Sequence, residues 1–254
     1  MSFGNLGDRM KDYESVPRTR LTRRTPVLAR LDGRAFNSLT RGMTKPYDGD
    51  FHACMWAAAM ALCKDIDGCR LAYVQSDEIT LLIVDYERLD SEAWFGHEVQ
   101  KMCSVAASVC TGAFNAEFFS RFPRKRKVPA FDARFWNVPK EEVANAFLWR
   151  QNDATRNSLQ MLCQSRFSSS QLHGKKSPDL HEMLHGIGLN WSHLPTAQKR
   201  GVCVVHVEEE TPGAEGPVLR HRWKVDTEIP IFSSPEGRAY IERHVVFPDE
   251  PVGG

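Results

Sequence analysis

The chain has 254 residues, of which 42% are hydrophobic, and its 33 basic and 32 acidic residues leave a net charge of +1. This composition indicates a globular protein of one large domain, or a domain with an appendage, and excludes binding of nucleic acid through a general positive field. Seven cysteines without a Cys-x-x-Cys pair favour reduced thiols, no signal peptide is evident, and the longest apolar stretch, residues 53–63, is too short for a bilayer. We therefore expect a cytoplasmic protein.

The hydrophobic pattern predicts a lead-in helix over residues 8–18 and then a β-α-β-β-α-β series. The series consists of a buried strand at 25–36, a helix at 48–66 that Asp48 or Asp50 caps, a hairpin at 70–85, a long helix at 91–119 and a strand at 129–138. A further helix follows at 140–167. This order predicts an α+β fold, with a ferredoxin-like βαββαβ antiparallel sheet of the palm type and helices on one face.

The C-terminal third of the chain has a less regular pattern. We expect a catalytic domain over residues 1–167 and an irregular C-terminal extension over 168–254 that packs against it. Within the extension, residues 201–208 and 219–227 have the pattern of two strands. They are predicted to form a hairpin around a long turn at 211–217.

Two aspartates lie where the predicted first strand and the hairpin meet. Asp32 ends the apolar run of residues 26–31, and Asp77 lies in the turn of the hairpin. In the predicted topology these strands are neighbours, so the two carboxylates approach each other. Carboxylates are ligands that Mg²⁺ prefers, and phosphates commonly complete its coordination. The pair predicts a two-metal site for phosphoryl or nucleotidyl transfer, against the simpler alternative of two turn residues beside strands.

Basic and polar residues elsewhere fit contacts to phosphate. Lys45 follows Asp32 closely enough to reach a triphosphate, although a surface lysine is the alternative. On the helix at 140–167, Arg150, Asp153 and Asn157 fall on one face, which is either a ligand-facing or a solvated stripe. One basic run without acidic neighbours precedes the fourth strand, and either phosphate contact or a solvated loop explains it. It consists of Arg124, Lys125, Arg126 and Lys127.

A short helix predicted over residues 178–185, with Ser177 as its N-cap and Gly186 at its end, carries a competing motif. The segment His181-Glu182-Met183-Leu184-His185 matches the H-E-x-x-H pattern of zinc metalloproteases. Zinc needs a third ligand, and Trp191 stands where the extended metzincin pattern has histidine. A zinc metalloprotease is therefore one alternative function, and an RNA-binding module without catalysis is another.

Several of these segments are similar, in order and spacing over roughly residues 5 to 207, to the tRNA-histidine guanylyltransferase superfamily of 3′-to-5′ nucleotide-adding polymerases. The matching segments are Arg30-Leu31-Asp32-Gly33-Arg34-Ala35-Phe36, Lys45-Pro46, Ser76-Asp77-Glu78, Phe131-Asp132-Ala133-Arg134, Arg150-Gln151 and Lys199-Arg200-Gly201. The eukaryotic enzymes carry His-Ile-Asn-Asn after the Arg-Gln pair, whereas this chain has Thr155-Arg156-Asn157-Ser158. It therefore most resembles the bacterial and archaeal branch, which repairs 5′-truncated tRNA.

The resemblance implies a role for each matching residue. The implied ligands of two Mg²⁺ ions are Asp32, the Gly33 carbonyl and Asp77, and the implied catalytic residues are Asp32, Asp77 and Glu78. The implied nucleotide-binding residues are Asp32, Gly33, Arg34, Ala35, Phe36, Asn37, Lys45, Ser76, Asp77 and Asn157. The implied contacts to tRNA are Arg150, Lys199 and Arg200, to which we add the basic run at 124–127. We expect that run to bind tRNA without affecting the chemistry.

The resemblance also implies a reaction and an assembly. A tRNA 5′-monophosphate is first activated with ATP or GTP, and the 3′-hydroxyl of an incoming nucleoside triphosphate then attacks the activated end. Metal ions neutralise charge on the transferring phosphoryl group in both steps. The expected activity is template-dependent repair of tRNA, with guanylate addition to histidine tRNA as a related activity. The expected assembly is a homotetramer, a dimer of dimers.

Overall fold

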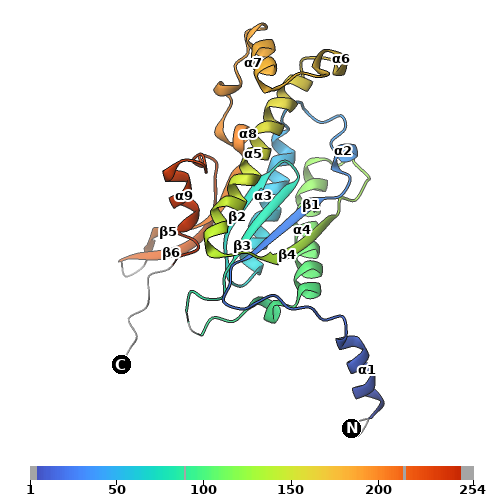
Figure 1. The fold of residues 1–254 in the computed structure, drawn as a ribbon, viewed down its shortest axis with the longest axis vertical. Helices are drawn as coiled ribbons and strands as arrows, with labels where there is room; N and C mark the ends of the chain where they lie inside the picture. Colours follow the sequence, from blue (N-terminus) through green and yellow to red (C-terminus); the bar gives the residue numbers. More distant parts are fainter. Residues whose placement is uncertain (1–4, 89, 214–215, 247–254) are drawn as a thin grey trace.

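The computed structural model describes residues 5–88, 90–213 and 216–246. Within these ranges six strands form one antiparallel sheet in the order β4-β1-β3-β2-β5-β6 (Figure 1). The strands are β1 (Val27–Gly33), β2 (Cys69–Gln75), β3 (Glu78–Ile83), β4 (Phe131–Asn137), β5 (Val202–Gly213) and β6 (Gly216–Asp226). The first four have the ferredoxin-like order, which confirms the predicted α+β fold.

Helices surround this sheet and extend beyond it. They are α1 (Leu6–Ser15), α2 (Phe36–Leu39), α3 (Gly49–Asp65), α4 (Val99–Arg121), α5 (Lys140–Gln164), α6 (Ser169–Leu172), α7 (Ser177–His185), α8 (Thr196–Arg200) and α9 (Pro235–Glu242). Short 3-10 turns occupy Trp94–His97 and Trp191–His193. None of the helices within the described ranges is both long and apolar enough to cross a membrane.

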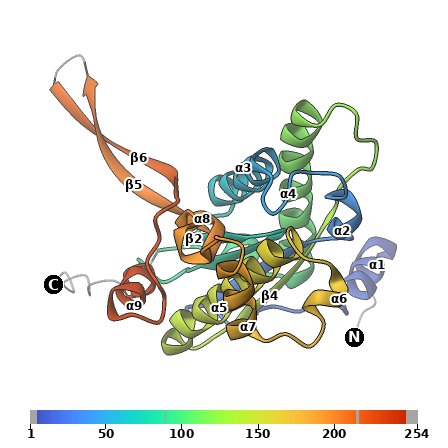
Figure 2. The same cartoon turned by 90° about the horizontal axis from the view of Figure 1, so that it is seen from above.

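The helices cover both faces of the sheet, so the expectation that they lie on one face was wrong. Helices α3 and α4 pack on one face, and α5 and α9 lie on the other (Figure 2). Strand β1 shows the reason, because Val27, Ala29 and Leu31 pack in the first core and Leu28 packs in the second. Alternate side chains of a strand point to opposite faces, so an uninterrupted apolar run needs cover on both.

Local backbone geometry sets the ends of the predicted elements. Of the two predicted candidates, Asp48 caps α3, because its Oδ1 accepts a hydrogen bond of 3.0 Å from the Phe51 amide. The first strand ends before residue 36 because Ala35 has a left-handed backbone with φ of 58°. The long helix begins at Val99 instead of 91, because Phe95 and His97 have φ of 50° and 59°. The N-cap of α7 is Lys176 instead of the predicted Ser177.

The C-terminal segment completes the same sheet. Strand β5 pairs with β2, and β5 and β6 then extend away from the body as a two-stranded arm (Figure 2). The predicted long turn was wrong, since β5 continues to Gly213 and β6 starts at Gly216. Prolines at 212 and 217 suggested a turn, but edge strands tolerate proline. Strands from both sides of the predicted domain boundary at 167 therefore belong to one sheet, and residues 247–254 of the extension lie outside the described ranges.

Candidate active site

The fold brings Asp32 and Asp77 together, as the order of elements predicts. Asp32 pairs with Glu78 across β1 and β3, and the Gly33 amide donates a hydrogen bond of 3.0 Å to the Asp77 carbonyl. The turn of the β2–β3 hairpin therefore lies beside the end of β1. Burial, together with the nearby Asp32 carboxylate, raises the pKa of Asp77. The raised pKa means that ionised Asp77 is disfavoured in the protein alone and is stabilised by a cation.

Three carboxylates lie in one row across adjacent strands. Asp32 on β1 pairs with Glu78 on β3 and with Asp132 on β4. Arg134 binds Asp132 at 3.0 Å, and Arg150 binds Glu78, so both outer members of the row are neutralised. Asp32, in the middle, forms no ion pair with any residue in the described part of the chain. The arrangement leaves its charge available to an ion from solution.

The oxygen atoms at this edge suit a hard divalent cation. The side chain of Asp77 accepts a hydrogen bond of 3.1 Å from Ser76 and forms no ion pair within the described ranges. Two carboxylates without a cationic partner match the hard oxygen ligands that Mg²⁺ takes, and water and phosphate commonly complete its coordination. Among the described residues there is no group of three or more histidine, cysteine, aspartate or glutamate side chains that could hold a metal ion by themselves. The site therefore needs backbone, solvent or substrate oxygens to complete a coordination shell.

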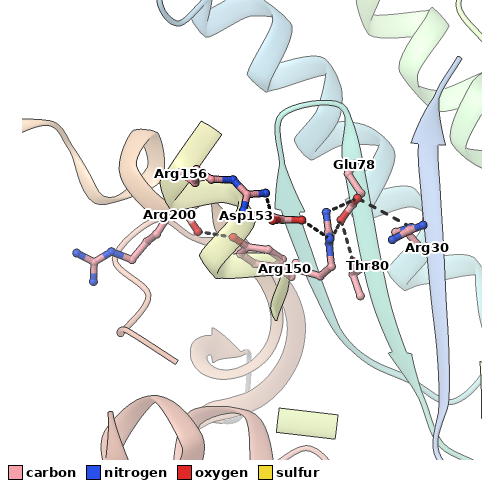
Figure 3. Close-up of polar contacts among 8 residues, drawn as sticks. Arg30, Glu78, Thr80, Arg150, Asp153, Arg156 and Arg200 are labelled. Carbon is pink, nitrogen blue, oxygen red and sulfur yellow. Dashed lines mark hydrogen bonds and ion pairs between the residues drawn. The ribbon is translucent and has the colours of Figure 1, made fainter. Parts of the chain in front are cut away.

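Glu78 lies in a buried network instead of at an open catalytic position. The guanidinium of Arg150 binds it with two hydrogen bonds, 2.6 Å from Nε to Oε1 and 2.8 Å from Nη2 to Oε2. Nη1 of Arg150 binds Asp153 at 2.7 Å, so the arginine lies between two acids (Figure 3). The side chains of Glu78 and Arg150 are only 8% and 9% exposed. The resemblance implied a catalytic role for Glu78 and a tRNA contact for Arg150. In this structure the two side chains form a buried ion pair with each other.

A short helix, α2, follows β1 because of two local constraints. A Cβ at Gly33 would lie 2.6 Å from the ring of Phe36, so only glycine fits beneath that ring. Phe36 is buried against Phe131, with ring centroids 5.0 Å apart. The left-handed backbone at Ala35 then turns the chain into α2. We call residues 35–41 the α2 segment.

The predicted triphosphate cradle has fewer free amides than expected. The amide of Gly33 binds the Asp77 carbonyl, and that of Arg34 binds the Ala130 carbonyl at 2.9 Å. The amides at the start of α2, those of Phe36 and Asn37, have no acceptor within the helix. Of the predicted cradle, the start of the α2 segment is the part whose amides can bind phosphate.

A cavity of about 410 Å³ opens beside the two aspartates. Its lining includes six of the predicted nucleotide-binding residues, namely Phe36, Asn37, Lys45, Ser76, Asp77 and Asn157. This volume falls in the range of about 300 to 1,000 Å³ that is typical of small-molecule sites. The structure thus joins residues from α2, the β2–β3 hairpin and α5 around one space.

Sequence reasoning missed the aromatic wall of this cavity. His52 and Trp56 lie one turn apart on α3 and stack at 6.4 Å, and burial lowers the pKa of His52, which favours its neutral form. Tyr47 and Trp191 both hydrogen-bond the Ser158 hydroxyl, at 2.6 and 2.9 Å. The i, i+4 spacing of His52 and Trp56 was a usable signal. The meeting of Tyr47 with Trp191 was not, because the two are far apart in the sequence.

The remaining predicted tRNA contacts lie away from the carboxylates. Lys199 donates a hydrogen bond of 2.8 Å to the Ser192 carbonyl, and the carbonyl of Arg200 accepts one of 2.6 Å from Tyr73. The side chain of Arg200 points away from the Glu78 network (Figure 3). A Cβ at Gly201 would lie 2.5 Å from the Val74 carbonyl. The Lys-Arg-Gly segment therefore docks α8 closely against β2.

The basic run divides into two pairs of side chains. Arg124 and Arg126 are exposed, and Arg126 donates to a carbonyl of its own loop. Lys125 and Lys127 instead donate hydrogen bonds to the α2 segment. Two of the four predicted tRNA-binding residues are therefore engaged within the protein, and the role of the run in binding tRNA stays a prediction.

The H-E-x-x-H segment has a structural explanation. Leu180 and Leu184 of α7 are buried against Leu159 and Leu162 of α5. The ring of His181 packs edge-on against Trp191 at 5.8 Å. No metal cluster of His, Cys, Asp or Glu includes these residues anywhere in the part of the chain that the structure describes. The motif follows from the amphipathic pattern of a short packed helix.

Replacing both His181 and His185 with alanine is expected to leave nucleotide addition within about twofold of the parent rate, since surface changes cost little stability. The parent protein is also expected to purify without stoichiometric zinc, which elemental analysis measures. A zinc content near one per chain, with a peptidase activity that the double variant loses, would contradict this expectation.

Known proteins match this chain in both sequence and structure. A family profile described as Thg1, tRNAHis guanylyltransferase, matches residues 7–139, just over half of the chain. A solved bacterial tRNA(His) guanylyltransferase (Thg1)-like protein in complex with ATP is 38% identical, with a TM-score of 0.86 over 96% of this chain and all of that one. The corresponding structure with GTP is 38% identical, with a TM-score of 0.80 over 95% of this chain and 99% of that one. A probable tRNA(His) guanylyltransferase of Dictyostelium discoideum is 27% identical over 70% of this chain and 74% of its own length.

Proposed function

Because the chain belongs to the tRNA(His) guanylyltransferase (Thg1) family, and is thus a nucleotidyltransferase, we propose that it adds nucleotides in the 3′-to-5′ direction to the 5′ end of tRNA. One observation carries the proposal: Asp32 and Asp77 come together without a cationic partner among the described residues, and Asp77 lines a cavity of about 410 Å³. An unpaired carboxylate pair at the mouth of a nucleotide-sized space is what metal-assisted transfer of a nucleotide requires.

We assign the metal site to the end of β1 and the hairpin turn. Asp32, the carbonyl oxygen of Gly33 and Asp77 would hold two Mg²⁺ ions. When bound, the ions neutralise the charge that develops on the transferring phosphoryl group. The catalytic role belongs to Asp32 and Asp77, while Glu78 acts on the site through Arg150.

The triphosphate then lies along the α2 segment. The amides of Phe36 and Asn37 at the start of α2 donate to its oxygens, and Lys45 supplies a positive charge from the cavity wall. Ser76 and Asn157 line the same cavity and provide polar contacts to the nucleotide. The neutral ring of His52 and the neighbouring Trp56 offer an aromatic surface to the base. The bound nucleotide is thereby oriented with its phosphates toward the two aspartates.

The proposed reaction has two transfers. An oxygen of the tRNA 5′-monophosphate attacks the α-phosphorus of ATP or GTP, and pyrophosphate leaves. The 3′-hydroxyl of an incoming nucleoside triphosphate then attacks the activated 5′-phosphorus, and the nucleoside monophosphate leaves. Each transfer moves negative charge onto a leaving phosphate, which is where nearby positive charge lowers the barrier.

We place the enzyme in the cytoplasm and propose that it works as a homotetramer. The seven cysteines, all within the described ranges, are free thiols, which suits a reducing compartment. The exposed arm of β5 and β6 and the exposed helix α1, which has no buried residue, offer surfaces for assembly. We propose repair of 5′-truncated tRNA as the main activity, because Thr155 stands at the histidine position of the eukaryotic motif.

The test of the proposed function incubates the purified protein with a tRNA that lacks its first nucleotide and carries a 5′-monophosphate. Reactions contain Mg²⁺ and all four nucleoside triphosphates, and the products are sequenced. The expected result is addition of the nucleotide that pairs with the opposite strand. A full-length histidine tRNA in parallel tests guanylate addition. If neither RNA is extended in Mg²⁺, while the protein is folded by circular dichroism, the proposed function is wrong.

A further inference from the structure

Two lysines from the loop before β4 hold the α2 segment at both of its ends. The α2 segment and the loop that joins α4 to β4 lie side by side (Figures 1 and 2). The ammonium of Lys127 donates to the Ala35 carbonyl at 3.2 Å and to the Ser38 hydroxyl at 2.6 Å. The ammonium of Lys125 donates to the carbonyls of Leu39 and Arg41, both at 2.8 Å.

The two lysines supply hydrogen-bond donors that the α2 segment does not supply for itself. Helix α2 spans only Phe36–Leu39, and a helix this short is not stable by itself, since nucleation fixes several residues for very few hydrogen bonds. Its last carbonyls have no donors within the helix, and a cation at that end is favourable. Lys125 binds there, and Lys127 binds at the start, where the strained backbone of Ala35 begins the turn.

The neighbouring arginines provide a natural comparison. Arg124 and Arg126 alternate with the two lysines along the loop and are exposed, and Arg126 donates a hydrogen bond to the Pro123 carbonyl of its own loop. The two lysines donate hydrogen bonds to the α2 segment, whereas Arg126 binds within its own loop and Arg124 is exposed. The four basic residues that look equivalent in the sequence therefore have different surroundings.

We propose that Lys125 and Lys127 are positioning residues, which keep the amides of the α2 segment in place for the triphosphate, and are not contacts to tRNA. This proposal rests on the proposed function. The lysines neither touch the two aspartates nor line the cavity. They act on the nucleotide through the backbone that they bind.

The test compares two matched double variants, in which methionine keeps the apolar stem and removes the charge. The first carries Lys125→Met and Lys127→Met, and the second carries Arg124→Met and Arg126→Met. Three quantities are measured for each: KM and kcat for the activating nucleotide at saturating tRNA, the affinity for labelled tRNA at several salt concentrations, and amide hydrogen exchange in the protein without ligands.

The lysine variant is expected to raise the nucleotide KM by about tenfold or more, since hydrogen bonds from charged donors are lost. Exchange is expected to quicken at the amides of Ser38 and Thr40, which bind the Ala35 and Phe36 carbonyls. The arginine variant is expected to keep the nucleotide KM and the exchange rates, and to bind tRNA with a shallower dependence on salt. A third variant, Lys125→Arg with Lys127→Arg, is expected to recover most of the nucleotide affinity.

The outcomes separate this proposal from the proposed function. A parent protein that adds no nucleotide refutes the proposed function, and the exchange rates of Ser38 and Thr40 still report whether the lysines hold the segment. An active parent whose lysine variant keeps its nucleotide KM and exchange rates, and loses tRNA affinity as the arginine variant does, overturns the positioning role. Thermal unfolding of each variant confirms that the differences are measured on folded protein.

Discussion

Replacing Asp77 with asparagine is expected to abolish nucleotide addition and to make the metal-free protein more stable. The loss of activity should exceed about a hundredfold, since even residues that only support metal ligands cost about 10- to 100-fold. The gain in stability follows because burial and Asp32 raise the pKa of Asp77, so its ionised form is penalised in the folded protein. Asparagine keeps the shape of the side chain and removes the charge.

The stability gain of the Asp77→Asn variant is expected to depend on pH in a defined direction. A raised folded-state pKa means that the folded protein holds the Asp77 proton more tightly than the unfolded chain does. The penalty is therefore full at neutral pH and disappears as pH falls through the raised pKa to below the ordinary aspartate value of about 4. The stability advantage of the variant over the parent should shrink along the same course.

Thermal unfolding with EDTA and with Mg²⁺, at several pH values, measures both effects. Mg²⁺ should raise the Tm of the parent, because an ion that binds only the folded state stabilises it, and should raise that of the Asp77→Asn variant much less. Asp132→Asn serves as the control, because Arg134 already neutralises that exposed carboxylate. Equal stabilisation of parent and Asp77→Asn by Mg²⁺ would argue against the metal assignment.

Replacing Arg150 with methionine is expected to destabilise the protein by about 3 to 5 kcal/mol, the usual cost of leaving one charge of a buried pair without its partner. Among the described residues, Glu78 would keep Arg30, whose Nε lies 4.0 Å from its carboxylate, as its remaining ion-pair partner. Denaturant unfolding measures the change. Arg156→Met is the matched control, because Arg156 also binds Asp153 but is 60% exposed, and surface pairs contribute about 1 kcal/mol or less.

A second variant separates stability from positioning. In Glu78→Leu with Arg150→Met both charges are removed, and buried pairs replaced by apolar residues commonly regain most of the lost stability. If Glu78 and Arg150 hold the Asp77 turn in place, this double variant is expected to regain stability and still to add nucleotides more slowly than the parent. Full activity in the stable double variant would leave the pair with no role beyond stability.

The order of elements in the sequence was enough to bring Asp32 and Asp77 together. Alternation and apolar runs identified the strands, and the ferredoxin-like order then made β1 and β3 neighbours. The cap of α3 could also be predicted from the sequence, because the Asp48 side chain accepts a hydrogen bond from an amide only three residues away. Such features depend on short-range periodicity or on topology, and both are properties of the linear chain.

The partners of Arg150, Lys125 and Lys127 were decided by the tertiary structure alone. The sequence predicts Arg150 as a residue that faces a ligand from a helix. Its main partner in the structure is Glu78, which lies 72 residues away on another element. Lys125 binds a backbone carbonyl 86 residues away, and Lys127 binds one 92 residues away. Every residue has a backbone carbonyl, so the residue types at positions 35 and 39 do not indicate that a lysine binds there. The sequence thus determined where the acidic residues would meet, whereas packing alone decided which basic side chains bind Glu78 and the α2 segment and which stay exposed to solvent.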